Sequence, residues 1–446
     1  MVINILLVLS LLINMATPLI VLSKFRKYSV YIFFFYYFNI DYINYLIGFN
    51  QGLIGYALKL YPDVFFGSLL LRMFLYNNSE GTNGNSSVKI NVFFLGFIGI
   101  SCAYMVYGVI NGNSVSRVIL DWRSCAIPIL VAFLVAKTKL LSFSEFSRVV
   151  SFCAILVVIN TLIAIYQYIT FNGLAESSWR YNFIKELQSR NDENYEERLV
   201  VYQVIRGDDL RASGLFASAL AYSYVAGMYC FYFYTKIFKR INSQNLLTKV
   251  LQLLAMIICA VGVYVSQVRS AFIIIAFCMI CHFIGINRKH GGVVKLKPTL
   301  LMTFSLLASF LMFIYLSLAG PDQLDASSYG RVLQYIQLIE SFSLFGAGLG
   351  AYKGLFDSFY IYGFMTFGIS FLLFVFYFIK YYIKTFKSTK LIGTISDSML
   401  VFCFTAFPSM ILLMSFQHVA GSIYYTLNFF ILFHCALCNF RGANNI

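Results

Sequence analysis

The chain alternates between long uncharged stretches and short segments rich in basic residues. A stretch of 43 residues between Asp397 and Arg441 contains no charged side chain, and another of 27 residues lies between Lys89 and Arg117. A helix needs about 20 apolar residues to cross a bilayer, whereas the strands of a membrane barrel alternate apolar and polar positions over short segments. The pattern therefore predicts membrane-spanning helices, which satisfy their own backbone hydrogen bonds in lipid.

We expect an all-α, polytopic integral membrane protein with about 12–14 transmembrane helices, forming a single transmembrane domain over residues 1–446. The first apolar stretch lacks a basic segment before it, which favours an uncleaved first span with its N-terminus outside. Asp41 and Asp63 interrupt the second and third spans and are expected to face a cavity or a partner helix. The expected spans are 2–22, 28–48, 52–76, 90–110, 118–136, 149–171, 215–235, 250–268, 270–287, 299–318, 358–379, 396–416 and 421–440.

Composition excludes a soluble fold. The chain is 60% hydrophobic and 11% charged, against a charged fraction of about 25% in soluble domains. Its ten cysteines are scattered, nearly all within apolar stretches, so they do not form the disulfide framework of a small secreted domain. The two Cys-x-x-Cys pairs lack four ligands at metal-site spacing, and we expect neither a metal site nor a cofactor.

The net charge of +15 reflects topology. Twenty-one of the 33 basic residues, with only three acidic ones, lie on the connections of one side, while the other side carries twelve basic and fifteen acidic residues. The positive-inside rule makes the basic side cytoplasmic, where it meets anionic lipid headgroups. The charge therefore indicates no nucleic-acid partner.

Two connections on the outer side are much longer than the usual four to six residues. Residues 172–214 contain six basic and eight acidic side chains, and Trp179-Arg180-Tyr181 within them mixes aromatic rings with charge. This mixture is typical of a helix that lies on a membrane surface. Residues 319–357 form the second long outer segment, and both segments are expected to be extracytoplasmic and functional.

Arginines at the outer ends of the spans are the strongest candidates for substrate binding or catalysis. Arg269 is the only charged residue between Lys249 and Arg288, so the chain is expected to turn around it at the outer surface. A guanidinium presents a planar fork that matches a pair of phosphate oxygens, and it stays charged at any physiological pH. The candidates expected to hold a pyrophosphate are Arg211, Arg269 and Arg331, and those expected to bind substrate nearby are Arg123 and Arg206.

Structural alternatives remain open for these arginines. Arg269 is also placed to reach lipid headgroups with its charged tip. Arg211 is also placed to pair with Asp208 and Asp209 at the base of the loop, since such pairs are often structural.

Other polar residues at the outer edge have two interpretations each. Asp357 is either a general base that takes a proton from a sugar hydroxyl or the N-cap of the helix that follows. Tyr329, Tyr335 and Tyr360 either line sugar subsites or serve ordinary packing. The glycines of segment 346–350 precede no Lys-Ser/Thr pair and are expected to form a tight turn or a close helix contact. The chain contains no Asp-x-Asp pair for a divalent ion.

The order of these features resembles the O-antigen polymerase and ligase superfamily over roughly residues 121–384. The motifs that carry the resemblance are Asp121-x-Arg123, Arg211-x-x-Gly214, Arg269-Ser270, Gly330-Arg331, Gly346-x-Gly348 and Asp357-Ser358-x-Tyr360. Ligases of this superfamily carry a His-Asn or His-Ser pair where this chain has Asp357-Ser358, which favours an O-antigen polymerase.

The resemblance implies a metal-independent, inverting glycosyltransferase of the bacterial inner membrane whose active site faces the periplasm. Donor and acceptor would both be undecaprenyl-diphosphate-linked oligosaccharides, joined during lipopolysaccharide biosynthesis, with membrane lipid, a chain-length regulator and a flippase as further partners. Two alternatives stay open. One is an O-antigen ligase that transfers polymer to a lipid A core, and the other is a flippase for lipid-linked oligosaccharide.

Overall fold

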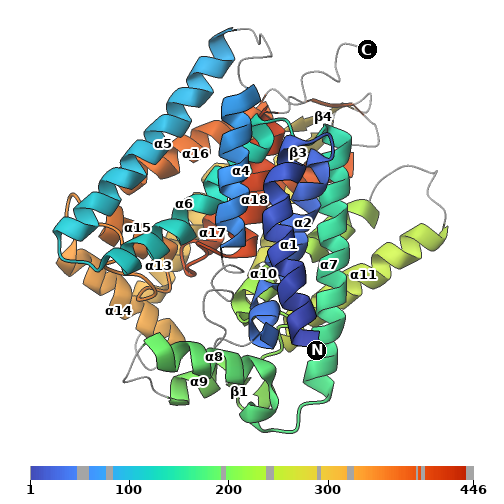
Figure 1. Ribbon diagram of the computed structural model, residues 1–446, viewed down its shortest axis with the longest axis vertical. Helices are drawn as coiled ribbons and strands as arrows, with labels where there is room; N and C mark the ends of the chain where they lie inside the picture. Colours follow the sequence, from blue (N-terminus) through green and yellow to red (C-terminus); the bar gives the residue numbers. More distant parts are fainter. Residues whose placement is uncertain are drawn as a thin grey trace. The chain divides into compact units, whose positions relative to one another are not determined.

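The computed structural model describes residues 2–47, 60–76, 84–191, 197–237, 246–288, 293–318, 326–387, 390–392 and 397–437. These residues form seventeen α-helices and five short strands (Figure 1). Four of the described helices are long and apolar enough to cross a membrane: α6 (Val115–Lys137), α7 (Phe143–Ile169), α11 (Leu246–Val265) and α13 (Pro298–Leu318). The predicted helical class is confirmed, and the apolar helices indicate a membrane-embedded protein. The number of spans stays a prediction.

The chain divides into two compact units. Unit 1 comprises Met1–Arg72, Thr138–Met279 and Ile395–Phe402. Besides α7 and α11, its described elements are α1 (Val2–Leu22), α2 (Arg26–Ile47), α4 (Tyr61–Tyr76), the 3-10 turn η1 (Ala175–Ser177), α8 (Trp179–Asn191), α9 (Glu197–Val204), β1 (Ile205–Arg206), β2 (Asp209–Leu210), α10 (Ala219–Ile237) and α12 (Arg269–Gly285).

Unit 2 comprises Met73–Lys137, Ile280–Thr394 and Cys403–Ile446, so α4, α12 and α17 each contribute residues to both units. Besides α6 and α13, its described elements are α5 (Gly84–Ile110), β3 (Ile286–Arg288), β4 (Val293–Leu296), α14 (Ala326–Ser341), α15 (Phe359–Phe367), α16 (Ser370–Lys387), β5 (Lys390–Ile392), α17 (Asp397–Leu413) and α18 (Ile423–Leu437). Strands β3, β4 and β5 pair antiparallel in that order.

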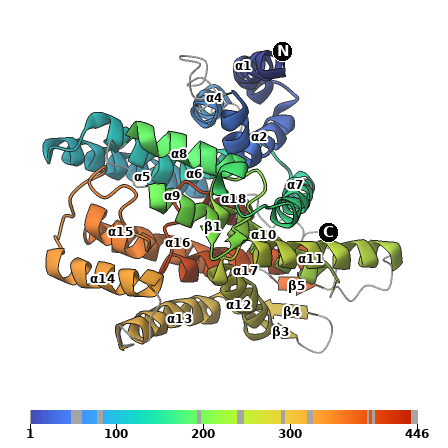
Figure 2. The same ribbon diagram turned by 90° about the horizontal axis from the view of Figure 1, so that it is seen from below.

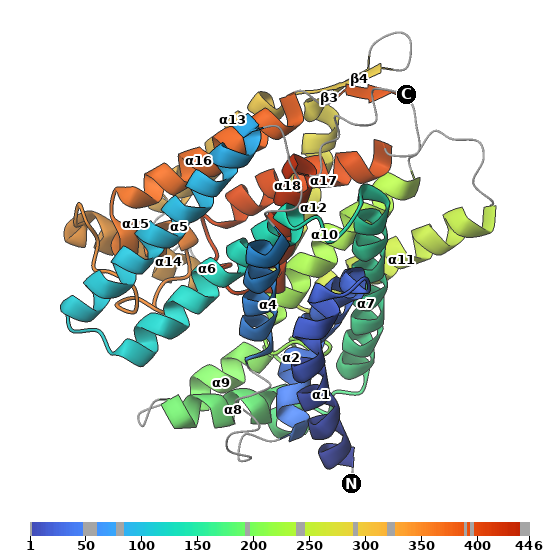
Figure 3. The same cartoon turned by 45° about the horizontal axis from the view of Figure 1, so that its top comes forward.

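Aromatic packing holds the first helices of unit 1 together, and α1, α2, α4 and α7 run side by side in Figure 3. The Phe33 ring of α2 stacks on Phe65 of α4 with centroids 4.8 Å apart, and Tyr31 meets Phe152 of α7 edge to face at 5.3 Å. Helix α7 begins at a capping box, in which Ser142 and Glu145 each accept the other's backbone N–H. Ser142 and Glu145 therefore define where this long apolar helix starts.

The predicted eleventh span, 358–379, is wrong as a single helix, because two helices, α15 and α16, occupy it. Gly368 ends α15 at φ 55°, a conformation that side-chain-bearing residues rarely adopt, and the Ile369 N–H bonds the Leu344 carbonyl. Of the predicted third span, 52–76, the structure describes only α4 and the residue before it. Helices α8, α9 and α14 lie in the two long segments predicted between spans, and the remaining described helices overlap their predicted spans with ends that differ by up to six residues.

Large apolar side chains cover the outside of several helices. On α11, Leu247 and Leu251 are more than half exposed, and on α13 so are Leu307 and Phe310. Soluble monomers rarely leave contiguous apolar surface bare, so these faces suit a lipid environment.

Topology is testable by labelling. A cysteine replacing Ser177, an exposed residue of the 172–214 segment, should react with an impermeant maleimide in intact spheroplasts. A cysteine replacing Ser144, exposed beside the basic segment before α7, should react only after lysis. The reverse pattern would invert the predicted orientation.

Candidate functional site

The long segment 172–214 is folded and belongs to unit 1. It forms η1, α8, α9 and the β1–β2 hairpin, which lie together in Figure 2. In the hairpin, Arg206 pairs with Asp209 across a tight turn at Gly207. The expected helix around Trp179 is present as α8. Its position on a membrane surface stays a prediction.

Arg180 organises this segment from within. Its side chain is only 4% exposed, and its three guanidinium nitrogens donate to the carbonyl oxygens of Gln203, Arg211 and Ala217 at 2.5 to 2.6 Å. Asp41 of α2 lies close enough to act on this charge electrostatically, and its carboxylate accepts the Ala217 N–H at 2.8 Å. Sequence reasoning predicted a partner helix or cavity for Asp41 but missed the structural role of Arg180.

Burial of Arg180 lowers its pKa to about 9. That pKa already includes two smaller effects, a further lowering by the nearby Arg211 and a raising by Asp41. Arg180 therefore keeps its charge at neutral pH, and each of its three guanidinium nitrogens donates to a main-chain carbonyl oxygen. These three bonds join distant parts of the loop, which gives Arg180 a structural role.

The loop re-enters the helical part of unit 1 at Gly214. This glycine has φ 63°, and an added Cβ would lie 2.5 Å from the Asn160 carbonyl oxygen, so only glycine fits. The Gln167 side chain of α7 bonds both the N–H and the carbonyl oxygen of Gly214. This contact fixes the backbone immediately after Arg211.

The guanidinium of Arg211 is partly buried and interacts electrostatically with a second cation. Burial and the neighbouring Arg206 guanidinium lower the pKa of Arg211. The hydroxyls of Tyr202 and Tyr224 also lie near it, and Tyr224 in turn hydrogen-bonds Ser270 at 2.8 Å. Within the described residues, the buried Nε of Arg211 has no hydrogen-bond partner.

The Asp209 carboxylate accepts a hydrogen bond from Gln267 Nε2 at 3.0 Å, and the pairing of Arg211 with Asp208 or Asp209 stays a prediction. Arg206 donates to the Gln267 carbonyl oxygen at 3.2 Å. We call Arg206, Arg211, Tyr224 and Ser270 the basic cluster. Two guanidiniums and two hydroxyls at one place can bind an anion, whose charge would relieve their mutual repulsion.

Arg269 begins α12 next to Ser270 of the basic cluster, and its side chain is exposed. Its predicted place at a turn between two apolar helices, α11 and α12, is observed. Whether it grips a ligand or reaches headgroups stays a prediction.

The remaining predicted residues belong to unit 2. Arg331 lies in α14, and its Nε is 3.9 Å from a carboxylate oxygen of Asp357. The N-cap interpretation of Asp357 is wrong by one residue, since the Ser358 side chain accepts the Ile361 N–H and caps α15. Asp357 instead is half exposed, and its own backbone N–H donates to Gln334 Oε1 at 2.9 Å. The structure therefore pairs two residues that the sequence predicted for separate roles.

The three candidate tyrosines differ in what their hydroxyls contact. Tyr335 donates to the Ser415 carbonyl oxygen, and Tyr360 donates to that of Ile411 at 2.9 Å. Both rings therefore anchor helices, while Tyr329 on α14 is 39% exposed. A sugar-binding role stays a prediction for all three.

The glycine segment packs as predicted. Gly348 has φ 82°, and a Cβ there would lie 2.6 Å from the Cα of Gly108 on α5. Gly350 follows with φ 88°, and its N–H donates to the buried Asp121 carboxylate of α6 at 2.8 Å. The glycine segment therefore makes a close contact with helix α5, and its hydrogen bond to Asp121 of α6 stabilises this arrangement.

Arg123 lies beyond Asp121 on α6, near Lys353. Sequence reasoning missed Lys353, which gave no signal because the residues around it come from distant parts of the chain. In the part of the chain that the structure describes, no three His, Cys, Asp or Glu side chains form a metal-binding group.

No model of a known protein family matches the chain, and neither a curated protein nor a solved structure matches it.

Proposed function

We propose that the protein polymerises lipid-linked oligosaccharides on the outer face of the bacterial inner membrane. An acceptor sugar hydroxyl attacks the anomeric carbon of the lipid-linked donor chain, the bond from that carbon to the diphosphate oxygen breaks, and polyprenyl diphosphate departs. The order of sequence motifs supports this proposal, as do the apolar helices, which suit a lipid-linked substrate.

The observation that carries the proposal is the geometry of Arg211. Its guanidinium interacts electrostatically with that of Arg206, and it lies on a loop that Arg180 and Gly214 hold in place. Fixed cations stabilise a leaving group best when they need no rearrangement as its charge grows. The basic cluster therefore suits the pyrophosphate of a departing lipid carrier.

Deletion of the gene tests this function against its two rivals. With a polymerase lost, the surface glycan should carry one repeat unit on the lipid A core, because ligation continues without polymerisation. Bare core with lipid-linked polymer retained would instead indicate a ligase. Bare core with lipid-linked single units held on the cytoplasmic side would indicate a flippase.

A further inference from the structure

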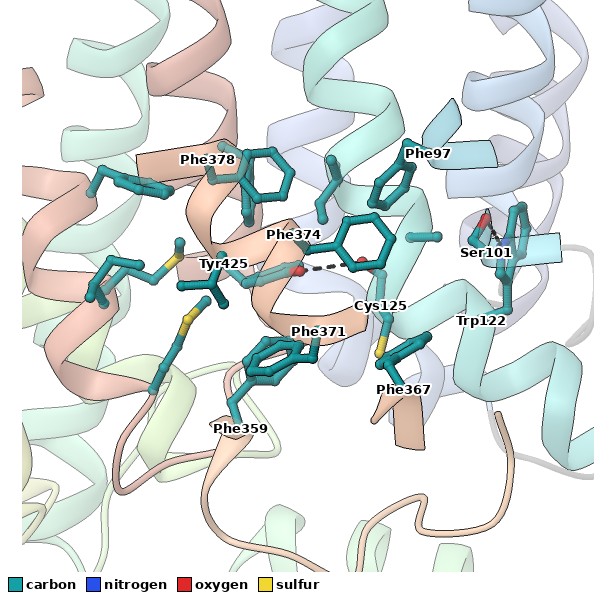
Figure 4. Close-up of a pocket in the computed structure, with 18 of the residues that line it drawn as sticks. Phe97, Ser101, Trp122, Cys125, Phe359, Phe367, Phe371, Phe374, Phe378 and Tyr425 are labelled. Carbon is teal, nitrogen blue, oxygen red and sulfur yellow. Dashed lines mark hydrogen bonds between the residues drawn. The ribbon is translucent and has the colours of Figure 1, made fainter. Parts of the chain in front are cut away.

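Unit 2 contains a small cavity, about 70 Å³ in volume, with an almost entirely apolar wall (Figure 4). The main polar groups in this wall are bonded to protein. The Trp122 indole N–H donates to the Ser101 hydroxyl at 3.1 Å, and the Tyr425 hydroxyl donates to the Cys125 carbonyl oxygen at 3.4 Å. The wall therefore suits apolar contacts, and the groups that suit an anion lie in unit 1.

In unit 1, Gln267 joins the turn between α11 and α12 to the β1–β2 hairpin. The Gln267 carbonyl oxygen accepts a hydrogen bond from Arg206 Nη1 at 3.2 Å, and the side-chain Nε2 donates to a carboxylate oxygen of Asp209 at 3.0 Å. The Ala212 N–H donates to the carbonyl oxygen of the last residue of α11 at 3.1 Å. The turn therefore holds the chain on both sides of Arg211.

The side chains of Arg206, Asp209 and Arg211 lie on one face of the hairpin. Arg206 is directly opposite Asp209, and the Arg211 N–H extends the pairing by donating to the Val204 carbonyl oxygen at 2.8 Å. Because side chains alternate between faces along a strand, residues 209 and 211 point to the same side. Arg206 and Arg211 are then diagonal neighbours, about 7–8 Å apart. An acidic side chain therefore shares this face with two guanidiniums.

The backbone of Gln267 is strained. Its φ is 56°, in the left-handed region, which residues with a side chain rarely adopt and which glycine adopts freely. Such strain persists where the surrounding contacts over-determine the conformation. The side chain of Gln267 must therefore contribute something that glycine lacks, and its contact is the hydrogen bond to the Asp209 carboxylate.

We propose that Gln267 is a positioning residue of the basic cluster. Its carbonyl oxygen holds Arg206, and its amide holds the Asp209 carboxylate, so that the Arg211 guanidinium is kept for an anion. Without the amide, the carboxylate would pair with either arginine and would repel a phosphate on the same face. The inference rests on the proposed function, because it concerns the cluster assigned to the departing diphosphate.

Binding of inorganic pyrophosphate to the purified full-length protein tests the inference apart from catalysis, and isothermal titration calorimetry measures it. Gln267→Ala should bind pyrophosphate about tenfold to a hundredfold more weakly than wild type, the effect of one hydrogen bond to a charged group. Gln337→Ala makes the same substitution at an exposed residue of α14 in unit 2, and it should match wild type.

Gln267→Gly separates positioning from folding. Glycine keeps the carbonyl oxygen that accepts Arg206 and adopts φ 56° without strain. The variant should therefore melt at about the wild-type temperature and still lose as much pyrophosphate affinity as Gln267→Ala. Affinity that falls only together with the melting temperature would overturn the positioning role, because the glutamine would then act through stability alone.

Removing the charge of Asp209 provides a rescue test. Gln267→Ala/Asp209→Asn should recover most of the lost affinity, because an uncharged amide neither pairs with the arginines nor repels a phosphate. Asp209→Asn alone should bind no more weakly than wild type. A double variant as weak as Gln267→Ala would overturn the inference, since restraint of the carboxylate would then not explain the loss.

The same titrations distinguish this inference from the proposed function. Wild type should bind pyrophosphate saturably, and Arg211→Ala should lose this binding. Equal affinity in wild type and every Gln267 variant, with binding lost in Arg211→Ala, would overturn the inference alone. Wild type that fails to bind, or binding that persists in Arg211→Ala, would overturn the basic cluster as the diphosphate site and the inference with it.

Discussion

Replacing Arg211 with lysine is expected to reduce polymerisation about a hundredfold to a thousandfold, the effect of removing one transition-state contact of 2.7 to 4 kcal/mol. An ammonium keeps the charge but cannot place two donors on neighbouring phosphate oxygens. The measurement is the length ladder of surface polysaccharide in a deletion strain, with variant protein at the wild-type level.

Arg148→Lys is the matched control, because it makes the same substitution at an exposed residue of α7 beside the predicted cytoplasmic segment. It should give a wild-type ladder. Arg269→Lys separates the two interpretations of that exposed residue, since a headgroup anchor tolerates lysine. A full-length ladder from Arg211→Lys would remove Arg211 from the pyrophosphate site.

Arg180→Met is expected to unfold the 172–214 segment locally, at a cost of about 3–5 kcal/mol, because it leaves the partly buried Asp41 without its counter-charge and three carbonyl oxygens without donors. Hydrogen exchange of the purified protein should show fast exchange over α8, α9 and the hairpin. Polymerisation should fall as well, because the carbonyl of Arg211 is one of the three acceptors and loss of this bond would release Arg211 from its position.

Two further variants test the cause of this loss. Adding Asp41→Asn to Arg180→Met should recover part of the stability, because the asparagine amide still accepts the Ala217 N–H and carries no charge. The interaction free energy between two substitutions at neighbouring residues is typically about 0.5–3 kcal/mol. Lys185→Met removes a cation of the same helix, which lies over the Tyr181 ring, and should cost about 1 kcal/mol or less. Unchanged hydrogen-exchange protection of α8, α9 and the hairpin in Arg180→Met would refute the structural role of Arg180.

Positions of the apolar helices could largely be predicted from sequence because a span needs a long uncharged stretch, although the capping box starts α7 six residues before its predicted span. Helix α1 has the predicted bounds 2–22. The division of the eleventh span was missed, because glycine is common inside membrane helices and the Ile369 N–H finds its acceptor in Leu344, far outside the predicted span.

The site was less predictable because its partners are far apart in sequence. The three carbonyl acceptors of Arg180 lie 23 to 37 residues downstream, a spacing with no helical or strand period. Asp357 and Ser358 are both favoured N-cap residues, and only the backbone shows that Ser358 is the cap. In contrast, the glycines at 346–350 could be predicted, since few other residues tolerate positive φ.

Polymerisation by the purified chain is the most direct test of the proposed function. The protein, reconstituted in vesicles with lipid-linked repeat units and excess EDTA, should yield a ladder of longer lipid-linked products, because arginines rather than a divalent ion offset the charge of the leaving diphosphate. Single repeat units that persist unchanged, with or without added magnesium, would contradict the assignment as a polymerase.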